Sequence, residues 1–267
     1  MERHELERAA QVAAQAADRA RIEILPRFRS VAVETKKDGS PVTEADREAE
    51  RAIREVLRNA YPDFGLLGEE FGAEGPGDAG AERPDASPYP TTPTWIIDPI
   101  DGTVAFSRGI PLFSTLIALV ENGEPVVGLI DLPALGERYI ATRGGGAHRN
   151  GEPVHASSAR ELRGSLVSHG DPFCFDLAGQ RPAFERMARE IPVLRGYTDA
   201  FGHAQVISGG VDAMVDFDLN PWDAAATQVL VTEAGGAFEL RRQANGKLGI
   251  VIGSPALVEQ LLGFLSP

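Results

Sequence analysis

Apolar residues at helical spacing predict two helices at the start of the chain. The first runs from Leu6 to Leu25 and stops at Pro26, which cannot continue a helix. The second follows Thr43 and runs to about Asn59. The apolar faces consist of Leu6, Ala9, Ala10, Ala13, Ala17 and Ala20 in the first helix and of Ala49, Ile53, Val56 and Leu57 in the second.

Short runs of β-branched and aromatic residues predict strands. In chain order they are a weak edge strand at Phe28–Glu34 and strands at Phe64–Glu70, Trp95–Ile97, Thr115–Val120, Val126–Leu129 and Arg138–Thr142. Asn122-Gly123 is typical of a hairpin turn between two of them. Strands that follow helices in this order favour an antiparallel or mixed sheet.

Beyond residue 150 the pattern changes to alternating strands and helices, which indicates an α/β unit. We expect strands at 165–168, 193–195, 213–217 and 250–252, and helices at about 180–189, 200–208, 224–234 and 255–265. The predicted fold class is therefore α/β, with an α+β N-terminal subdomain at 1–150 and an α/β C-terminal subdomain at 151–267. Residues 72–93 are rich in Gly, Pro, Ala, Asp and Ser, which predicts a surface loop. Whether this loop is a lid or a plain excursion stays open.

Composition restricts the classes of partner. The chain has 267 residues, 43% of them hydrophobic, and a formal net charge of −13, which argues against nucleic acid as the main partner. Cys174 is the single cysteine, so neither an intramolecular disulfide nor a thiolate zinc site is possible. The charged N-terminus lacks the apolar core of a signal peptide, and no apolar run of about 18 residues predicts a membrane span. We therefore expect a soluble, cytoplasmic protein.

Candidate chemistry is concentrated in Asp98-Pro99-Ile100-Asp101-Gly102-Thr103. Pro99 cannot donate to a sheet, so we expect the chain to leave the sheet there and the two acids to lie in a turn at the strand end. A pair of turn aspartates is the plain structural alternative. However, carboxylates beside a helix start provide oxygen ligands for Mg²⁺ next to backbone N–H groups that can bind phosphate. The stretch is therefore a candidate metal and phosphate site.

Other acids have structural explanations of similar weight. Thr43 and Asp46 resemble a capping box at the start of the second helix. Adjacent Glu69 and Glu70 are usually solvent-facing, and Asp223 could be the N-cap of its helix. His203, within a helical run, is more typical of a structural hydrogen bond than of a ligand. None of these residues points to chemistry by itself.

Together the motifs resemble the inositol monophosphatase family of magnesium-dependent phosphate monoesterases. The matching segments, in family order, are Val42–Asp46, Gly68–Glu70, Trp95–Thr103 and Trp222–Ala225 followed by Glu233–Gly236. The resemblance implies a layered αβαβα sandwich, assembled as a homodimer. One departure is Ala105-Phe106, where the family often has Asn-Phe. The local anchoring of the short helix expected to begin at Gly102 and Thr103 is therefore in doubt.

The resemblance also implies roles for individual residues, and a cofactor of two or three Mg²⁺ ions. Glu69, Asp98 and the carbonyl of Ile100 would hold one Mg²⁺, and Asp98, Asp101 and Asp223 a second, with a third ion near Glu69. Asp46 and Thr103 would position and activate water, and Lys36 lies where the family has a lysine near the site. The phosphate would be bound at Asp101, Gly102 and Thr103.

Softer matches favour the histidinol-phosphatase branch of this family. They lie in Arg108–Leu119, Thr198–His203 and Asn220–Asp223. The leaving group of histidinol phosphate carries an ammonium and an imidazole, which carboxylates would bind. Candidates for the substrate site are Asp199, His203, Asp216 and Asp218, although Asp199 could equally cap its helix.

Three hypotheses follow from the sequence. The first is a phosphatase for histidinol phosphate, acting in histidine biosynthesis. The second keeps the same chemistry with inositol phosphate or another small sugar or nucleotide phosphate. The third is a non-catalytic regulatory or scaffold protein, which the complete set of acids argues against.

Overall fold

Two long helices cover one face of the first sheet. The computed structural model describes residues 1–36, 41–76 and 87–265. In it α1 (Arg3–Ile24) and α2 (Glu44–Ala60) pack side by side through the predicted apolar faces. Helix α1 ends in a 3-10 turn, η1 (Leu25–Arg27), and Thr43 caps α2 as predicted. Both predicted helices are therefore confirmed.

The first sheet has eight strands in the order β10-β9-β8-β7-β6-β5-β3-β4. Their bounds are β3 (Gly65–Gly68), β4 (Gly72–Glu74), β5 (Thr94–Asp101), β6 (Ser114–Glu121), β7 (Glu124–Leu132), β8 (Glu137–Thr142), β9 (Ala147–Arg149) and β10 (Glu152–Pro153). β3 runs parallel to β5 and the other neighbours are antiparallel, so the expected mixed sheet is confirmed. The expected edge strand at 28–34 is wrong for most of its length, because β1 (Val33–Thr35) begins late. In the described part of the chain it pairs with β2 (Pro41–Thr43) and not with the first sheet.

The second sheet has five strands in the order β12-β11-β13-β15-β14. They are β11 (Val167–His169), β12 (Leu194–Arg195), β13 (Ala213–Leu219), β14 (Ala237–Arg242) and β15 (Leu248–Gly253). The helices of this half are α4 (Pro172–Leu177), α5 (Arg181–Glu190), α6 (Asp199–Ile207), α7 (Pro221–Glu233) and α8 (Pro255–Leu262). The sequence pattern did not predict α4 or β14, which are respectively short and poor in buried residues.

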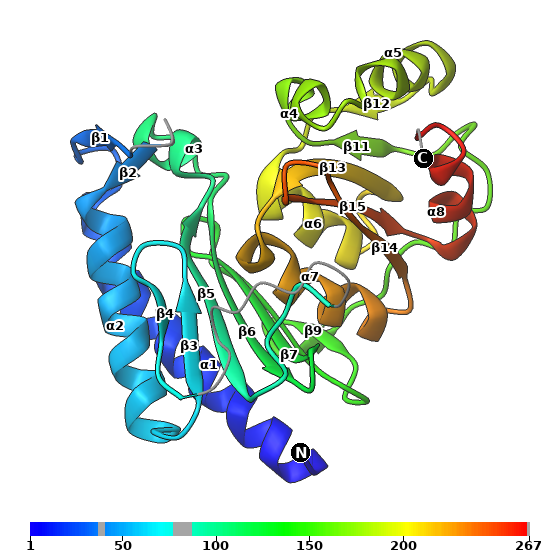
Figure 1. Cartoon of the computed structure of the whole chain (residues 1–267). Helices are drawn as coiled ribbons and strands as arrows, with labels where there is room; N and C mark the ends of the chain where they lie inside the picture. The colour runs from blue at the N-terminus through cyan, green and yellow to red at the C-terminus, as the bar shows by residue number, and fades with distance from the viewer. Residues whose placement is uncertain (37–40, 77–86, 266–267) are drawn as a thin grey trace.

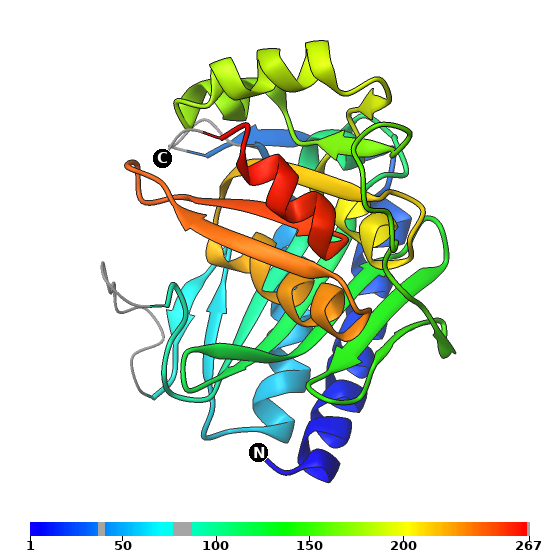
Figure 2. The same cartoon turned by 90° about the vertical axis from the view of Figure 1, so that its right-hand side faces the viewer.

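The helices and sheets form five layers, which the two views in Figures 1 and 2 show, and three apolar cores join them. The first core lies between α1, α2 and the first sheet. The second lies between the two sheets and contains α6 and α7, with Leu116 and Ile130 on one side and Met214 and Ile252 on the other. The third packs α4, α5 and α8 on the outer face of the second sheet. The expected αβαβα sandwich is therefore confirmed.

One local expectation at the central motif is wrong. β5 does not leave the sheet at Pro99 but continues to Asp101, with an irregularity in its pairing to β6 between Asp98 and Asp101. A β-bulge tolerates proline because the bulged residue does not need to donate to the ladder. A short helix, α3 (Thr103–Ser107), follows directly after Gly102.

The division of the chain into subdomains at residue 150 stays a prediction. In the structure this residue lies between β9 and β10 of the first sheet, and the core between the sheets draws on both halves. None of the helices in the described part of the chain is long and apolar enough to cross a membrane.

Candidate active site

An acidic cleft of about 200 Å³ opens between the end of β5 and the second sheet. Eight carboxylic acids and no lysine or arginine are found among the described residues that line it. These acids are Glu69, Asp98, Asp101, Asp171, Asp199, Asp216, Asp218 and Asp223. Three larger cavities lie elsewhere, and the described residues around each include no more than three acids. The cleft is therefore the place where most of the sequence candidates meet, although Lys36 and Asp46 do not line it.

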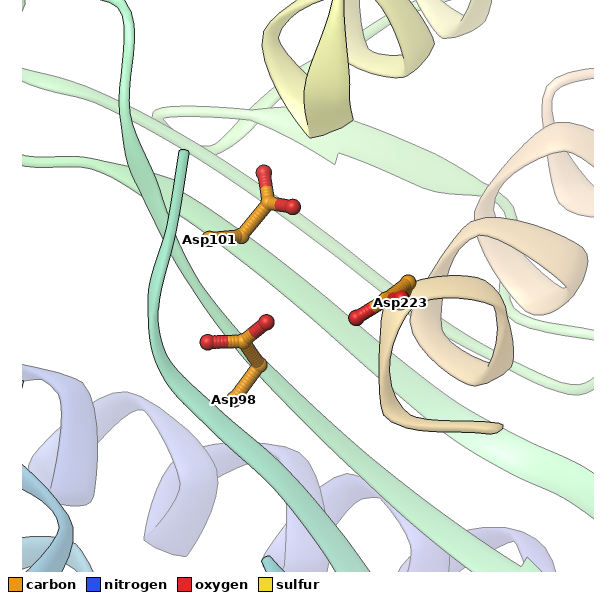
Figure 3. Close-up of side chains that lie close together, drawn as sticks. All are labelled: Asp98, Asp101 and Asp223. Carbon is orange, nitrogen blue, oxygen red and sulfur yellow. The ribbon is translucent and has the colours of Figure 1, made fainter. Parts of the chain in front are cut away.

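Three of the predicted metal ligands point toward one another across this cleft (Figure 3). One carboxylate oxygen from each of Asp98, Asp101 and Asp223 lies within 4.8 Å of the others. Asp98 is 2% exposed, and its Oδ1 has no hydrogen-bond partner in the described part of the chain. A buried carboxylate oxygen without a partner is costly unless a cation compensates it. The donor set is all oxygen, as a hard divalent cation such as Mg²⁺ requires, so the residues fit this ion.

The bulge in β5 brings the two aspartates of that strand together. Asp98 pairs with Leu116 on β6, whereas Asp101, three residues later, pairs with Ser114 only two residues away. In a regular strand, residues three apart point to opposite faces, and the extra residue of the bulge corrects this alternation. Ser114 Oγ donates to Asp101 Oδ2 over 2.9 Å and fixes the side chain in the cleft.

Burial and mutual repulsion make this cluster a poor place for uncompensated charge. Burial raises the pKa of Asp98 and of Asp101 well above the usual range of a carboxyl, and neighbouring acids add to the increase. Burial also raises the pKa of Asp223 to about 7. Protons and a divalent cation would therefore compete for the same oxygens.

Two acids of the site also belong to helix capping boxes. Thr43 N donates to Asp46 Oδ2 over 2.8 Å at the start of α2, and Asn220 N donates to Asp223 Oδ2 over 2.7 Å at the start of α7. The predicted capping box at Thr43 and Asp46 is confirmed. The N-cap explanation of Asp223 is wrong, because Asn220 is the N-cap and Asp223 is the third helical residue. In both boxes the cap engages Oδ2. This leaves the other oxygen of Asp223 for the cleft, whereas Asp46 is buried and does not line it.

Asp46 and Thr103 meet as the resemblance implied. Thr103 Oγ1 lies 3.3 Å from Asp46 Oδ1 and 3.0 Å from the carbonyl of Ile100, and it can donate its single proton to either. Asp46 is fully buried, and burial raises the pKa of its carboxyl. The pair therefore links the N-terminus of α2 to the start of α3 beside the acidic cluster.

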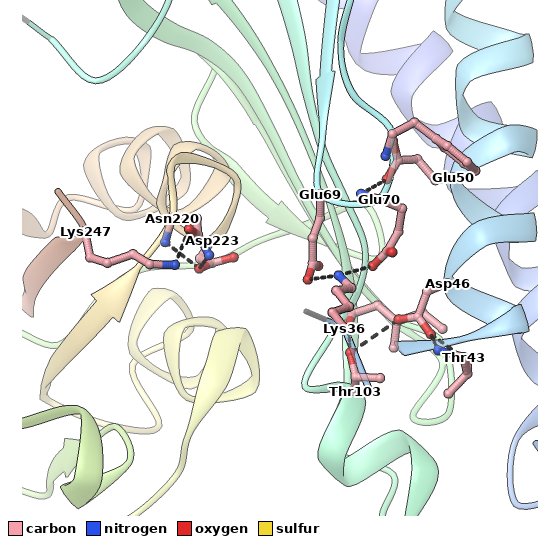
Figure 4. A network of polar contacts seen from close by, with 12 residues as sticks. Lys36, Thr43, Asp46, Glu50, Glu69, Glu70, Thr103, Asn220, Asp223 and Lys247 are labelled. Atoms are coloured by element: carbon pink, nitrogen blue, oxygen red, sulfur yellow. Dashed lines mark hydrogen bonds and ion pairs between the residues drawn. The ribbon is translucent and has the colours of Figure 1, made fainter. Parts of the chain in front are cut away.

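Lys36 neutralises the two glutamates at the end of β3 (Figure 4). Its Nζ lies 2.7 Å from Glu69 Oε1 and 2.6 Å from Glu70 Oε1. Burial alone would lower the pKa of Lys36, but the hydrogen bonds to these two carboxylates outweigh it and raise the pKa. Burial raises the pKa of Glu70 to about 7. Glu69 lines the same cleft as Asp98, although it is not one of the three acids that converge within 4.8 Å.

The opposite wall comes from α6 and β13. Asp216 Oδ2 lies 3.4 Å from His203 Nε2, and His203 Nδ1 lies 2.9 Å from Thr227 Oγ1. Both Asp216 and His203 are buried. Asp218 follows on the same strand, where Asn245 Nδ2 donates to its Oδ1 over 3.0 Å. These predicted substrate-site residues therefore lie on one wall of the cleft.

Asp199 joins this wall to the acidic cluster. The N-cap explanation of Asp199 is wrong, because Thr198 is the N-cap of α6 and Asp199 is the first helical residue. Its backbone is in the left-handed region, with φ 58°, and Thr198 Oγ1 donates to its Oδ2 over 2.9 Å. Burial and then the charge of Asp216 raise the pKa of Asp199 to about 6. The next amide, Ala200 N, donates to Asp101 Oδ2 over 2.8 Å.

Gly102 lies at the junction of the two walls. Its φ of 81° is in the left-handed region. A Cβ there would lie 3.1 Å from the carbonyl oxygen of Leu112 and 3.3 Å from Asp199 Oδ2. Glycine at this position therefore relieves both backbone strain and crowding.

Six residues of the cleft lining were not among the sequence candidates for the site, and Asp171, Cys174 and Trp222 are three of them. Asp171, the N-cap of α4, and Cys174 lie on the wall from the second sheet, and Trp222 lies beside Asp223. Burial raises the pKa of the Cys174 thiol to about 12. The dipeptide Asp171-Pro172 predicts only a helix start, so no local signal connects it to the cleft.

Comparison with known proteins supports the resemblance that the sequence motifs indicated. A model of the inositol monophosphatase family matches residues 2–261. The chain is 41% identical to the histidinol-phosphatase of Chlorobaculum parvum over 80% of this chain and 78% of that protein. It is 36% identical to the histidinol-phosphatase of Streptomyces coelicolor over 97% of this chain and 96% of that protein. Among solved structures it resembles the extragenic suppressor protein suhB of Bartonella henselae, with a TM-score of 0.82, 29% identity and coverage of 96% and 97% of the two chains.

Proposed function

We infer, since this chain belongs to the inositol monophosphatase family, that it is a metal-dependent phosphatase that hydrolyses the phosphate monoester of a small molecule. The observation that carries this proposal is the convergence of Asp98, Asp101 and Asp223, with a buried carboxylate oxygen that has no partner in the described structure. Such a cluster suits a divalent cation better than it suits a structural role, because no lysine or arginine lines the described cleft to compensate its charge.

We propose that the substrate is L-histidinol phosphate. Two similar proteins carry the name histidinol-phosphatase at 41% and 36% identity. The chemistry of the opposite wall supports the same substrate, because Asp199 and Asp216 can bind the ammonium and imidazole of the leaving group. His203 and Asp218 would support them. An inositol leaving group has only hydroxyls and would leave these carboxylates without a cationic partner from the substrate.

The proposed ligands of two or three Mg²⁺ ions are Glu69, Asp98, the carbonyl of Ile100, Asp101 and Asp223. When bound, the ions would supply positive charge beside the phosphate oxygens and lower the pKa of water. Glu69 would have to exchange Lys36 for the metal, or share its two oxygens between them. Asp101 and the backbone N–H groups of Gly102 and Thr103 would orient the phosphate group.

The remaining groups prepare water for attack. When Thr103 donates its proton to Asp46, its oxygen carries more negative charge and accepts a proton from water more readily. Water would then attack phosphorus as the bond to the leaving alcohol oxygen breaks, and that oxygen takes up a proton. The capping bonds from Thr43 hold Asp46 in place throughout. This assignment makes the Thr103–Asp46 pair important for turnover rather than for binding.

The test is phosphate release from L-histidinol phosphate and myo-inositol 1-phosphate, side by side, with Mg²⁺ and with EDTA. We expect Mg²⁺-dependent release that strongly favours histidinol phosphate. Asp199→Asn and Asp216→Asn should each lower kcat/KM for histidinol phosphate about ten- to hundredfold, the loss of one charge-assisted hydrogen bond, with a smaller effect on the inositol ester. The exposed Glu185→Gln on α5 is the control and should change neither.

Other outcomes would contradict separate parts of the proposal. Equal losses on both substrates would remove Asp199 and Asp216 as selectors of the leaving group. A preference for the inositol ester would keep the metal chemistry and change the substrate. No release from either ester with excess Mg²⁺ would favour a non-catalytic role for this fold.

We further propose that the enzyme acts in the cytoplasm as a homodimer. The dimer rests on the resemblance described for the sequence, and the location rests on the single cysteine, which is typical of a reducing compartment. Sedimentation equilibrium of the purified chain tests the dimer, and a mass of one chain would contradict it.

A further inference from the structure

A polar stripe runs along the buried side of α2. Asp46, Glu50 and Arg54 follow one another at intervals of four residues and so lie on one face of the helix. Glu50 is fully buried and Arg54 is 3% exposed. The proposed function uses Asp46 but gives no role to the rest of the stripe.

Glu50 accepts hydrogen bonds from the turn that follows the proposed metal ligand Glu69 (Figure 4). Glu70 N donates to Glu50 Oε2 over 2.8 Å, and Phe71 N donates to Oε1 over 3.3 Å. Arg54 Nε donates to the same Oε1 over 2.8 Å. One buried carboxylate therefore satisfies three donors, two of them the amides directly after Glu69.

The glycine of the Gly68-Glu69-Glu70 motif fits against this carboxylate. A Cβ on residue 68 would lie 2.1 Å from Glu50 Oε1. The observed position of the Glu50 carboxylate is therefore possible only with glycine at position 68. Arg54 extends the contact, because it also donates to the carbonyl of Gly72 and to Glu74 Oε2. Glu50 and Arg54 together hold the chain from Gly68 to Glu74 on α2.

We propose that Glu50 is a positioning residue that fixes the direction of the Glu69 side chain and so increases the affinity of the cleft for a divalent cation. The inference rests on the proposed role of Glu69 as a ligand. Because Asp46 and Glu50 are one turn apart on α2, the same helix fixes both the water-positioning acid and the turn that carries a metal ligand. Glu50 itself does not line the cleft that contains the proposed metal ligands.

The competing explanation is that Glu50 and Arg54 are only a buried ion pair that stabilises the fold. Asp131 provides a matched control. It is also fully buried and pairs with two arginines, Arg21 over 2.6 Å and Arg138 over 2.7 Å. These pairs hold α1 on β7 and β8, and no hydrogen bond in the described structure connects Asp131 to the turn at Glu69. Asp131→Asn should therefore lose stability without losing metal affinity.

The experiment is calorimetric titration of the EDTA-treated, dialysed full chain with Mg²⁺ alone, in the absence of substrate. Glu50→Gln should weaken Mg²⁺ binding about ten- to hundredfold, the range found when a group that orients a metal ligand is changed. The amide has one acceptor oxygen and one donor end, so it cannot satisfy the three donors around it. Asp131→Asn should change the Mg²⁺ dissociation constant less than about twofold. Thermal unfolding of both variants reports the loss of stability separately.

Each outcome decides between the explanations. An unchanged Mg²⁺ affinity in Glu50→Gln, or an equal loss in Asp131→Asn, overturns the proposal. If Glu50→Gln does not fold, Arg54→Lys decides, because it keeps the buried positive charge but loses part of the support for the Glu50 carboxylate. Arg54→Lys should then weaken Mg²⁺ binding, and unchanged binding overturns the proposal. Glu69→Gln tests the proposed ligand separately from the positioning role of Glu50. If this substitution does not weaken Mg²⁺ binding, the assignment of Glu69 as a ligand is wrong.

Discussion

Replacing Asp98 by asparagine is expected to stabilise the metal-free protein. The ligand oxygens of Asp98, Asp101 and Asp223 lie within 4.8 Å of one another. At an effective dielectric constant of about 20, two full charges at this separation repel by about 3 kcal/mol. The cluster avoids part of this repulsion by retaining protons. We therefore expect the substitution to increase the free energy of unfolding of the metal-free protein by about 2–3 kcal/mol at pH 8. For a chain of this size the gain corresponds to an increase in Tm of about 5 °C.

The sign of the pH dependence follows from the raised pKa values. A carboxyl whose pKa is higher in the folded state holds a proton that the unfolded chain has already released, so stability falls as pH rises through that interval. For Asp223 the interval extends from its ordinary value of 3.8 to a pKa of about 7, and the pKa values of Asp98 and Asp101 are also raised. The metal-free wild type should therefore unfold at a lower temperature at pH 8 than at pH 5.5. Asp98→Asn should reduce this difference.

The assay is thermal unfolding at pH 5.5 and pH 8, each with EDTA and with saturating Mg²⁺. Mg²⁺ should stabilise the wild type most at pH 8, where the cluster carries most charge, and should stabilise Asp98→Asn little. Glu259→Gln, an exposed acid on α8, is the control for removing one negative charge and should change the free energy of unfolding by less than about 0.5 kcal/mol. An EDTA-treated Asp98→Asn that is less stable than the wild type at pH 8 would refute the electrostatic argument, as would equal stabilisation of both by Mg²⁺.

Three further predictions concern single positions. Thr103→Ala should lower kcat about 10²- to 10³-fold while Mg²⁺ binding stays unchanged, because it removes the hydroxyl next to Asp46 and no proposed metal ligand; a loss only in KM contradicts this role. Gly68→Ala should lower both Tm and Mg²⁺ affinity, since its Cβ displaces Glu50; wild-type values for both would show that the turn adapts. Alkylation of Cys174 by iodoacetamide should be very slow at pH 8 and rise about tenfold per pH unit, because its thiol pKa is about 12; the rate of an ordinary exposed cysteine at pH 8 would exclude this.

The regular elements with strong periodicity were predictable from sequence. The apolar faces of α1 and α2 have the spacing of one side of a helix, and the structure places Ala13, Ala17, Ala49 and Ile53 in the first core. The short elements were not predictable in this way. β14 has only intermediate and exposed residues, so it carries no apolar alternation strong enough to indicate a strand.

The central motif shows where local rules fail. Proline at position 99 correctly indicated an interruption of the ladder, but the strand continued beyond it because the pairing with β6 extends to Ser114. The rule describes one residue, whereas the strand is stabilised by its neighbours on both sides. The bulge that resulted is what aligns Asp98 with Asp101.

By itself the sequence determined the capping box at Thr43 and Asp46, the helices with long apolar faces, and the set of acids that resembles a known family, because these depend on residues close together in the chain. Only the tertiary structure decided which acids meet. Asp171 lies on the wall of the cleft. Glu50 and Arg54 have a spacing typical of a solvent-facing helix surface, but in the structure they are buried and hold the turn at Glu69. These outcomes depend on which surfaces pack together over long sequence separations, and burial then changes what the same charged side chain costs and does.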